Sequence, residues 1–370
     1  MRQSYASIDL SALMQNLRLL KGAAPHSDSL AVVKADAYGN GAVEIAKHIA
    51  PEVNMLAVAM LDEAIPLREA GINLPILVLQ GPHQASELSA TDAYNLHWMI
   101  HNKHQLEWLE QHQASKQNAI DNLGARLWLK FDTGMHRLGF DIDDFDTVLH
   151  NHRHLTNSST VIATHLACAD EQDRTHTDQQ ISRFLQGVKN AGMRLSVANS
   201  AGALAHASAQ QDINRIGIAL YGSSPFDTSH STFGVNDSIG LKAVMTLTAK
   251  IIGLRTIPKG DTVGYGGTWT ASKPSTIATV AIGYADGYPR HAPNGTPAIC
   301  RGQRIKLVGR VSMDMLTFDV SELDDVALYD EVELWGKQLP INEIARFVGT
   351  IGYELMTRIS ARVPRRYTTK

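Results

Sequence analysis

Residues 30–41 read LAVVKADAYGNG, a short apolar run that leads directly into Lys34 and a turn containing glycine. Seven similar runs follow, at residues 55–59, 75–79, 96–100, 125–129, 160–163, 195–198 and 216–220. Several are separated by stretches with helical periodicity, the clearest at residues 181–188. Alternating strands and helices predict a parallel sheet covered by helices, and eight units are the number that closes a (β/α)8 barrel. A doubly wound open sheet is the alternative, because the number of runs is easily wrong by one or two.

The pattern changes after residue 222. Residues 223–240 (SSPFDTSHSTFGVNDSIG) are rich in Ser, Asp, Gly and Pro, which predicts a linker. Beyond them, turns with Gly, Pro and Asp separate apolar runs at residues 244–248, 276–282, 305–308, 315–320 and 332–335. We therefore expect a barrel over residues 1–222 and a mostly antiparallel β domain over residues 241–370.

The composition is that of a packed protein without a strong overall charge. Of 370 residues, 44% are hydrophobic and 19% charged, and the net charge is −3, which argues against disorder and against nucleic-acid or membrane partners. The two cysteines, Cys168 and Cys300, fit neither a disulfide framework nor a metal-ligand spacing. We find no secretory leader and no apolar stretch of membrane-spanning length. We expect a cytoplasmic protein without a metal, whose partners are small molecules or copies of itself.

Polar residues follow several of the expected strands. Reactive groups of such barrels project from the carboxyl ends of the strands. The chain places there Lys34, Lys130, His165 and Asn199–Ser200, with Arg215 at the start of the eighth run. One lysine at a strand end is usually only solvated, but several cations at one mouth repel each other unless an anion binds there. The pattern predicts a phosphorylated cofactor, and it makes Lys34 a candidate for a Schiff base.

Nine motifs resemble those of the alanine racemases, which are pyridoxal phosphate (PLP) enzymes. They are VVKADAYGNG, KFDTGMHRLGF, THLACAD, Asn199–Ser200, NRIGIALYG, VGYGGTWT, GYADGYPR, GRVSMDM and GYELMTRISARVPR. Each motif alone is weak, but nine in the same order, from about residue 5 to residue 366, make chance agreement very unlikely. The resemblance implies a barrel followed by a β domain, in a homodimer whose active sites are each shared between the subunits.

The resemblance also implies two catalytic bases. Lys34 matches the lysine that holds PLP and, once free, acts as the base for D-alanine. Tyr265, in VGYGGTWT, matches the opposing base for L-alanine and is expected from the partner subunit, although packing in a Gly-rich turn would explain it alone. Racemisation needs a base on each face, because the proton leaves one side of Cα and returns to the other. A tyrosine with its usual pKa of about 10 is a poor base at neutral pH, so we expect His165 and Arg215 to assist it with positive charge.

Other matches imply contacts with the cofactor. Arg215, with His165 behind it, is expected at the pyridine nitrogen. A guanidinium stays protonated and leaves that nitrogen unprotonated, which makes the ring a weaker electron sink and discourages transamination. The groups expected around the phosphate are the hydroxyls of Tyr38, Ser200 and Tyr353, the backbone N–H groups of Gly217 and Ile218, and Asn199 beside Ser200.

The remaining matches concern the substrate. Arg137, in KFDTGMHRLGF, matches the residue that binds the substrate carboxylate, helped by the backbone N–H of Met313 from the other subunit. Tyr284 is expected to line the entrance and restrict side-chain size, although aromatic packing explains it nearly as well. Lys130 would repel Arg137; the family resolves this by carbamylating that lysine with CO2, and we expect the same here. The chain has Ser312 where the family often has cysteine, which we expect to change little beyond thiol reactivity.

Three other functions fit part of the pattern. A racemase of broader amino-acid specificity would keep the same two bases. A PLP carrier that only buffers the cofactor would need neither Tyr265 nor the Met313 loop, and a decarboxylase of related architecture would have a carboxylate in place of Arg215. We therefore expect interconversion of L-alanine and D-alanine. The residues do not separate a role in peptidoglycan synthesis from one in alanine catabolism.

Overall fold

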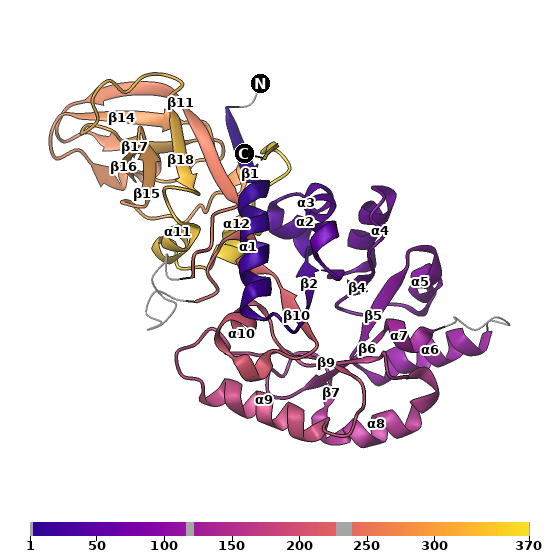
Figure 1. The fold of residues 1–370 in the computed structure, drawn as a ribbon. Coiled ribbons are helices and arrows are strands. Elements are labelled where there is room, and N and C mark those ends of the chain that lie inside the picture. Colours follow the sequence, from indigo (N-terminus) through magenta and orange to yellow (C-terminus); the bar gives the residue numbers. More distant parts are fainter. Residues whose placement is uncertain (1–2, 116–121, 227–238, 370) are drawn as a thin grey trace.

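The computed structural model describes residues 3–115, 122–226 and 239–369. They form two domains, each built on a β-sheet, and helix α1 (Leu10–Ala23) runs where the two domains meet (Figure 1). The Asn16 side chain of this helix donates to the carbonyl of Leu220 in the first domain and to that of Lys242 just before the second. Helix α1 therefore connects the domains through packing as well as through the chain.

The N-terminal domain is a parallel barrel. Its strands are β2 (Asp28–Val32), β3 (Met55–Val58), β4 (Ile76–Val78), β5 (Leu96–Ile100), β6 (Leu127–Asp132), β8 (Val161–Ala163), β9 (Arg194–Ser196) and β10 (Ile213–Ile216), with β7 (Phe140–Asp141) beside β6. The eight strands pair in chain order, and β10 pairs with β2. The Ser196 hydroxyl donates to the Ile213 carbonyl, which joins β9 to β10. This order confirms the (β/α)8 barrel and excludes the doubly wound sheet, in which the strand order reverses.

Helices surround the barrel sheet (Figure 1). They are α2 (Lys34–Gly39), α3 (Ala42–Ile49), α4 (Leu61–Glu69), α5 (Ala90–Ala93), α6 (Lys103–Ser115), α7 (Leu123–Arg126), α8 (Phe145–Asn151), α9 (Thr175–Gly187) and α10 (Ser200–Ala205). Helix α9 has the expected amphipathic pattern, because Ile181 and Phe184, one turn apart, are both buried.

The eighth barrel strand lies earlier than the expected run at 216–220. Residues Ile218–Tyr221 form a buried 3-10 turn. The strand ends at Ile216, because the backbone of the next residue, Gly217, leaves the extended region (φ −126°, ψ −99°). Strand β10 itself contains buried Asn214 and Arg215, so a search for apolar runs passes over it. Similarly, Lys130 lies within β6 and not after it.

The C-terminal domain is a mostly antiparallel sheet. Its strands are β1 (Ser4–Asp9), β11 (Met245–Ile257), β14 (Ser275–Val280), β15 (Pro297–Cys300), β16 (Gln303–Leu307), β17 (Leu316–Asp319), β18 (Glu331–Trp335) and β19 (Arg365–Thr368); β12 (Thr262–Val263) and β13 (Trp269–Thr270) form a separate hairpin. Both β14 and β18 pair with β11, which closes a small barrel. Two helices, α11 (Ile341–Phe347) and α12 (Gly352–Thr357), were not expected, because such short helices show little periodicity.

The first strand contributes to the C-terminal sheet, whereas the expected division places residues 1–222 in the barrel. Strand β1 pairs with β11 in antiparallel and with β19 in parallel orientation. Buried Ala6 and Ile8 alternate along it with half-buried residues, as in a strand with one face on a core. The chain thus begins in one sheet, forms the barrel and returns. Of the expected linker at 223–240, residues 227–238 lie outside the described residues.

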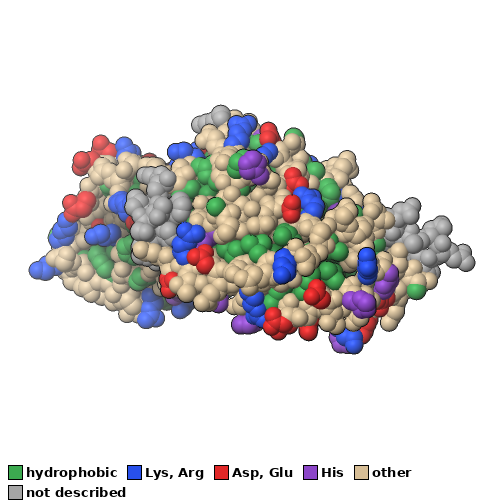
Figure 2. Space-filling model, turned by 60° about the horizontal axis from the view of Figure 1, so that its bottom comes forward, with side chains coloured by type: hydrophobic (Ala, Val, Ile, Leu, Met, Phe, Trp, Pro, Cys, Tyr) green, Lys and Arg blue, Asp and Glu red, His purple; other side chains and the backbone are tan. Residues whose placement is uncertain are grey.

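The surface carries mixed charge. On the face shown in Figure 2, Lys and Arg side chains lie among Asp and Glu side chains. Within the described ranges, no helix has the length and apolar character needed to cross a membrane. A search of the same ranges finds no group of three or more His, Cys, Asp or Glu side chains arranged to hold a metal ion.

Candidate active site

A cavity of about 720 Å³ opens at the carboxyl ends of the barrel strands. Eleven of the expected site residues line it: Lys34, Tyr38, Lys130, Arg137, His165, Asn199, Ser200, Arg215, Gly217, Ile218 and Tyr353. Tyr353 lies on α12 of the C-terminal domain, and the others come from the barrel. Both domains therefore build this cavity.

Lys34 begins a turn with an unusual backbone. Residues 35–38 are all left-handed, with φ of 51°, 53°, 52° and 55°. Each residue other than glycine costs roughly 1–2 kcal/mol in this conformation, so the surrounding structure has to hold the turn. The Glu63 carboxylate does so at one end, because it accepts the N–H of Ala35 at 2.8 Å and the N–H of Ala59 at 2.6 Å. The turn places both Lys34 and Tyr38 on the cavity wall.

The environment lowers the pKa of both cavity lysines. For Lys34, burial is the main cause and Arg137 adds to it, while Glu63 opposes the change. The pKa of Lys130 is lowered to about 8, again mainly by burial and then by Arg215 and Arg137. Only a neutral amine attacks an electrophilic carbon, and a pKa near 8 leaves part of the Lys130 population neutral under physiological conditions.

Arg215 is a fixed cation at the base of the cavity. Its guanidinium donates to the Ser196 carbonyl and hydroxyl at 3.0 and 2.6 Å, and to the Thr164 carbonyl at 2.7 Å. It also donates to Nδ1 of His165 at 3.2 Å. Burial lowers the pKa of Arg215 to about 10, so it stays protonated at neutral pH.

His165 differs from expectation in its charge. Burial, and then the charge of Arg215, lower the pKa of His165 well below its usual value, so the ring is neutral. The expectation that His165 adds positive charge is therefore wrong. Its position beside Arg215 agrees with the expectation, and its Nδ1 atom accepts one of the guanidinium hydrogens.

Two phenols are placed to donate hydrogen bonds into the cavity. The rings of Tyr38 and Tyr353 lie 6.1 Å apart. Burial raises the pKa of Tyr38 to about 12 and also raises that of Tyr353, so both hydroxyls keep their protons. A Cβ atom at Gly217 would lie 2.6 Å from Tyr38 Oη, so the absence of a side chain there makes room for the hydroxyl.

Ser200 lies beside these phenols at the start of α10. The Asn199 side chain accepts the Gly202 N–H at 2.9 Å, which caps this helix and fixes the position of Ser200. The Gly217 N–H donates to Ser200 Oγ at 2.9 Å, whereas we expected it to face the phosphate directly. Because Oγ accepts this bond, the Ser200 hydroxyl hydrogen is directed to another acceptor.

Arg137 lies at the cavity mouth on a loop organised by Asp132. One carboxylate accepts the N–H groups of Gly134, Met135 and His136 at 2.9–3.1 Å. Partial burial acts to raise the pKa of Asp132, but these backbone donors outweigh it and the pKa is lowered. The loop is therefore built around an ionised carboxylate, which fixes the backbone position from which the Arg137 side chain extends.

Three expected residues do not reach the cavity of their own chain. Tyr265, Tyr284 and Met313 lie on the C-terminal domain with exposed fractions of 72%, 37% and 54%. Packing within the chain therefore does not explain Tyr265. Tyr284 and Met313 lie on adjoining loops, because the Tyr284 N–H donates to the Ser312 carbonyl at 3.0 Å.

Sequence reasoning missed residues that hold the cavity without reacting in it. Asp132 organises the Arg137 loop, and Glu63 holds the turn after Lys34. Tyr221 packs on the Tyr38 ring at 4.9 Å and donates to the Val32 carbonyl. Only Glu63 has a weak signal in the sequence: it lies four residues after Ala59, the end of an apolar run, and accepts the Ala59 N–H. The others carry no local signal.

Comparison with known proteins identifies the family of this chain. The profile of the alanine racemase N-terminal domain matches residues 8–225, and that of the C-terminal domain matches residues 244–367. This chain belongs to the alanine racemase family. It is 47% identical over 364 residues to the alanine racemase of Alteromonas mediterranea, with 98% of each chain covered. The crystal structure of the biosynthetic alanine racemase from Pseudomonas aeruginosa matches with a TM-score of 0.92 at 42% identity, and that of Acinetobacter baumannii with 0.92 at 36%, each over 100% of both chains.

Alanine racemases are isomerases that use PLP, and the residues of the cavity fit this cofactor. PLP carries an aldehyde, a pyridine nitrogen and a phosphate. The cavity offers an amine of lowered pKa on Lys34, a buried donor on Arg215, and protonated phenols on Tyr38 and Tyr353. Because glycine has no side chain, Gly217 leaves the space around Tyr38 Oη open.

Proposed function

We propose that this protein interconverts L-alanine and D-alanine with PLP and two bases on opposite faces of the substrate. The observation that carries the proposal is that Lys34, whose pKa is lowered, lines the same cavity as the buried guanidinium of Arg215. A decarboxylase of related architecture would have a carboxylate at the position of Arg215. The names of the relatives support alanine as the substrate.

Two residues move the proton. Bound PLP supplies an electron sink that makes the Cα–H bond of the substrate acidic. Lys34 Nζ accepts or returns the proton on the face that serves D-alanine, and Tyr265 Oη of a second subunit does so on the face that serves L-alanine. Because each base serves one face, the substrate need not rotate between loss and return of the proton.

Other residues would bind and orient the cofactor. The hydroxyls of Tyr38, Ser200 and Tyr353 would hold the phosphate, with the Ile218 N–H, while Asn199 and Gly217 keep Ser200 in place. Arg215 would donate to the ring nitrogen, and His165 holds Arg215 in position.

The substrate side of the site draws on both subunits. Arg137 would bind the substrate carboxylate, together with the Met313 N–H of the second subunit, and Tyr284 of that subunit would narrow the entrance. The exposure of Tyr265, Tyr284 and Met313 on one chain supports this arrangement, since each is free to enter a neighbour's cavity.

Mixed dimers test the two bases and the shared site together. Lys34→Ala and Tyr265→Phe are each expected to lose most racemisation, measured in deuterated water as conversion of either enantiomer into the other. The two variants are co-expressed with different tags and purified as a mixed dimer. One of its two sites then combines the intact Lys34 of one chain with the intact Tyr265 of the other, so about half of the wild-type rate is expected. An inactive mixed dimer would show that the site is not shared.

Lys130 is expected to carry a carbamate. Its neutral amine nitrogen attacks the carbon of CO2, an electron pair of one C=O bond moves to oxygen, and the amine proton passes to water. The anion formed would remove the repulsion between Lys130 and Arg137. Nuclear magnetic resonance of protein equilibrated with 13C-labelled CO2 should show a carbamate signal that is absent from Lys130→Ala. An identical spectrum for both proteins contradicts the assignment.

A further inference from the structure

The end of the left-handed turn is held by a segment far away in the sequence. We name residues 34–41 the Lys34 turn, and we propose that Arg365 and Tyr367 of β19 are positioning residues that set the orientation of Lys34 through this turn. The inference rests on the proposed role of Lys34 as the cofactor lysine.

Arg365 joins the Lys34 turn to the segment that follows α12. Its Nε donates to the Gly39 carbonyl at 3.0 Å. The other guanidinium nitrogens donate to the carbonyls of Ile359, Ser360 and Val363, each at 2.7 Å. One half-buried guanidinium thus fixes the end of the turn against the chain that leads out of α12, the helix that carries Tyr353.

Tyr367 reaches the same turn two residues further along β19. Its hydroxyl donates to the Asn40 carbonyl at 3.1 Å. Gly41 has a φ of +94°, and a Cβ atom there would collide with this hydroxyl. A Cβ atom at Gly39, where φ is +78°, would collide with the Met356 carbonyl. The turn therefore packs its backbone directly against the C-terminal domain and has no room to relax toward it.

The beginning of the turn is fixed from the barrel side. Glu63 accepts the Ala35 N–H, and the Asp36 carboxylate accepts the Ala42 N–H at 2.7 Å across the turn. Strand β19 is itself anchored, because Arg365 pairs with Ala6 of β1. The strained residues 35–38 thus lie between a barrel carboxylate and a C-terminal strand, and the orientation of Lys34 depends on both.

The chain offers a matched control on the same strand. The Arg366 guanidinium lies over the ring of Tyr5 at 3.9 Å and makes none of the bonds described for Arg365. Arg366→Ala removes the same charge, one residue away, without touching the Lys34 turn. Arg365→Lys keeps the charge but cannot reach four carbonyl groups at once, and Tyr367→Phe removes a single hydroxyl.

The experiment compares Arg365→Ala, Arg365→Lys, Tyr367→Phe and Arg366→Ala with the wild-type chain. The first measurement is hydrogen exchange of the backbone amides of residues 35–42 in the cofactor-free protein. The second is the rate at which borohydride traps pyridoxal on Lys34. Pyridoxal is used because it lacks the phosphate, and the reaction is run well below the unfolding temperature. Both rates depend on the equilibrium between the ordered and the opened Lys34 turn, and loss of one hydrogen bond changes that equilibrium by about two- to tenfold. We therefore expect a change of about two- to tenfold in both rates for Tyr367→Phe and of about tenfold or more for Arg365→Ala. Exchange should become faster and trapping slower.

The outcomes separate the inference from the function on which it rests. If Arg365→Ala and Tyr367→Phe match Arg366→Ala in both measurements, the positioning role is wrong. If Arg365→Ala does not fold, Tyr367→Phe and Arg365→Lys decide in its place. If the wild-type chain is not trapped at Lys34, the proposed cofactor lysine is wrong, while the exchange measurement still decides whether β19 holds the turn.

Discussion

Gly217 shows how much of the cavity depends on one missing side chain. The Tyr38 hydroxyl lies where a Cβ atom at residue 217 would come within 2.6 Å of it. The Tyr38 ring cannot easily move away, because it packs between Tyr221 at 4.9 Å and Tyr353 at 6.1 Å. A methyl group at this position therefore displaces the Tyr38 hydroxyl, which we propose binds the phosphate, and leaves the barrel strands in place.

Gly217→Ala is expected to weaken PLP binding about tenfold, because forcing an extra methyl into a packed site costs about 1–3 kcal/mol. Titration of cofactor-free protein with PLP measures this. Gly22→Ala is the matched control: nothing lies within 4 Å of its Cβ position, and the residue is in helix α1. It should leave PLP affinity unchanged and stabilise the fold by about 0.5 kcal/mol. Equal PLP affinities for the two variants would contradict the role given to Gly217.

At the scale of elements, the Arg137 loop depends on a single carboxylate. Asp132 is the last residue of β6, and its side chain holds three N–H groups of the loop that follows. Such bonds contribute about 0.5–1.5 kcal/mol each, so the loop loses its organisation without them. The effect should appear in substrate binding, since the proposed phosphate contacts lie on other elements.

Asp132→Ala is therefore expected to raise the KM for alanine about five- to tenfold, with PLP affinity within about twofold of wild type. Steady-state kinetics in both directions, with PLP in excess, provide the measurement. Asp143→Ala removes an exposed carboxylate from the same domain, where it pairs with Arg183, and serves as the control. An unchanged KM in Asp132→Ala would contradict the proposal that the Arg137 loop binds the substrate carboxylate.

Which elements the sequence predicts depends on how polar their buried residues are. Seven barrel strands overlap the expected apolar runs, but β10 lies mostly outside its run, because its buried residues include the polar Asn214 and Arg215. Residues proposed to react or bind, such as Lys34, stand in motifs that a resemblance identifies. Residues that hold those motifs, such as Arg365, act over more than 300 positions of sequence, and no local pattern marks them.

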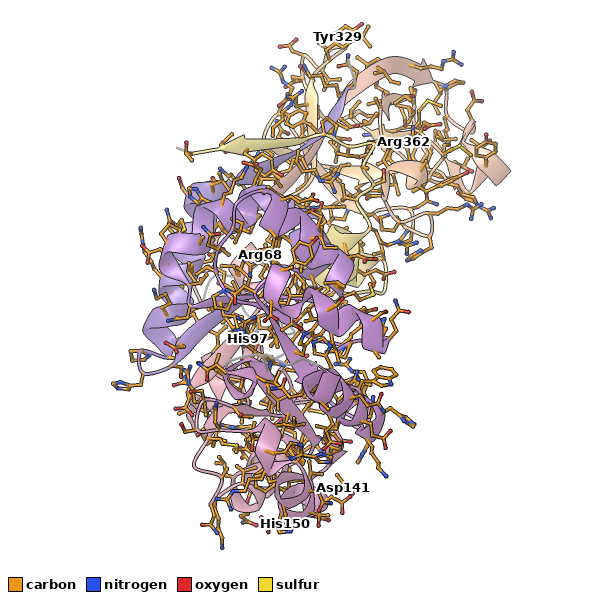
Figure 3. All side chains as sticks on the ribbon, turned by 90° about the vertical axis from the view of Figure 1, so that its right-hand side faces the viewer. Arg68, His97, Asp141, His150, Tyr329 and Arg362 are labelled. Carbon is orange, nitrogen blue, oxygen red and sulfur yellow. The ribbon has the colours of Figure 1, made fainter. Side chains whose placement is uncertain are left out.

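At the scale of the whole molecule, a histidine in the barrel links stability to pH. Figure 3 shows Arg68 and His97 in the same part of the barrel domain, with His150 at its far end. Burial, then Arg126 and Arg68, lower the pKa of His97 to about 4. Between this pKa and the unfolded value of about 6.5, the unfolded chain binds the proton and the folded chain does not. Stability is therefore lost as the pH falls from about 6.5 toward 4.

His97→Gln should remove this loss, because glutamine does not titrate. Between pH 7.5 and pH 5 the wild-type free energy of unfolding is expected to fall by about 1–2 kcal/mol more than that of the variant. Urea unfolding at the two pH values measures the difference. His150→Gln, an exposed site on α8, should behave as wild type. A parallel loss in wild type and His97→Gln would assign the pH dependence to other groups.

The position of β1 has a consequence for the order of events during synthesis. This strand is synthesised well before its partners, because they are residues of β11 and β19, more than 230 positions later in the sequence. The barrel strands, by contrast, pair with neighbours in the sequence and can assemble as they emerge. Strand β1 therefore stays an unpaired edge until the barrel is finished, and the C-terminal sheet closes last. The contacts of β19 with the Lys34 turn form in that same late step, so the lysine proposed to hold the cofactor is positioned only after residues 365–367 have been synthesised.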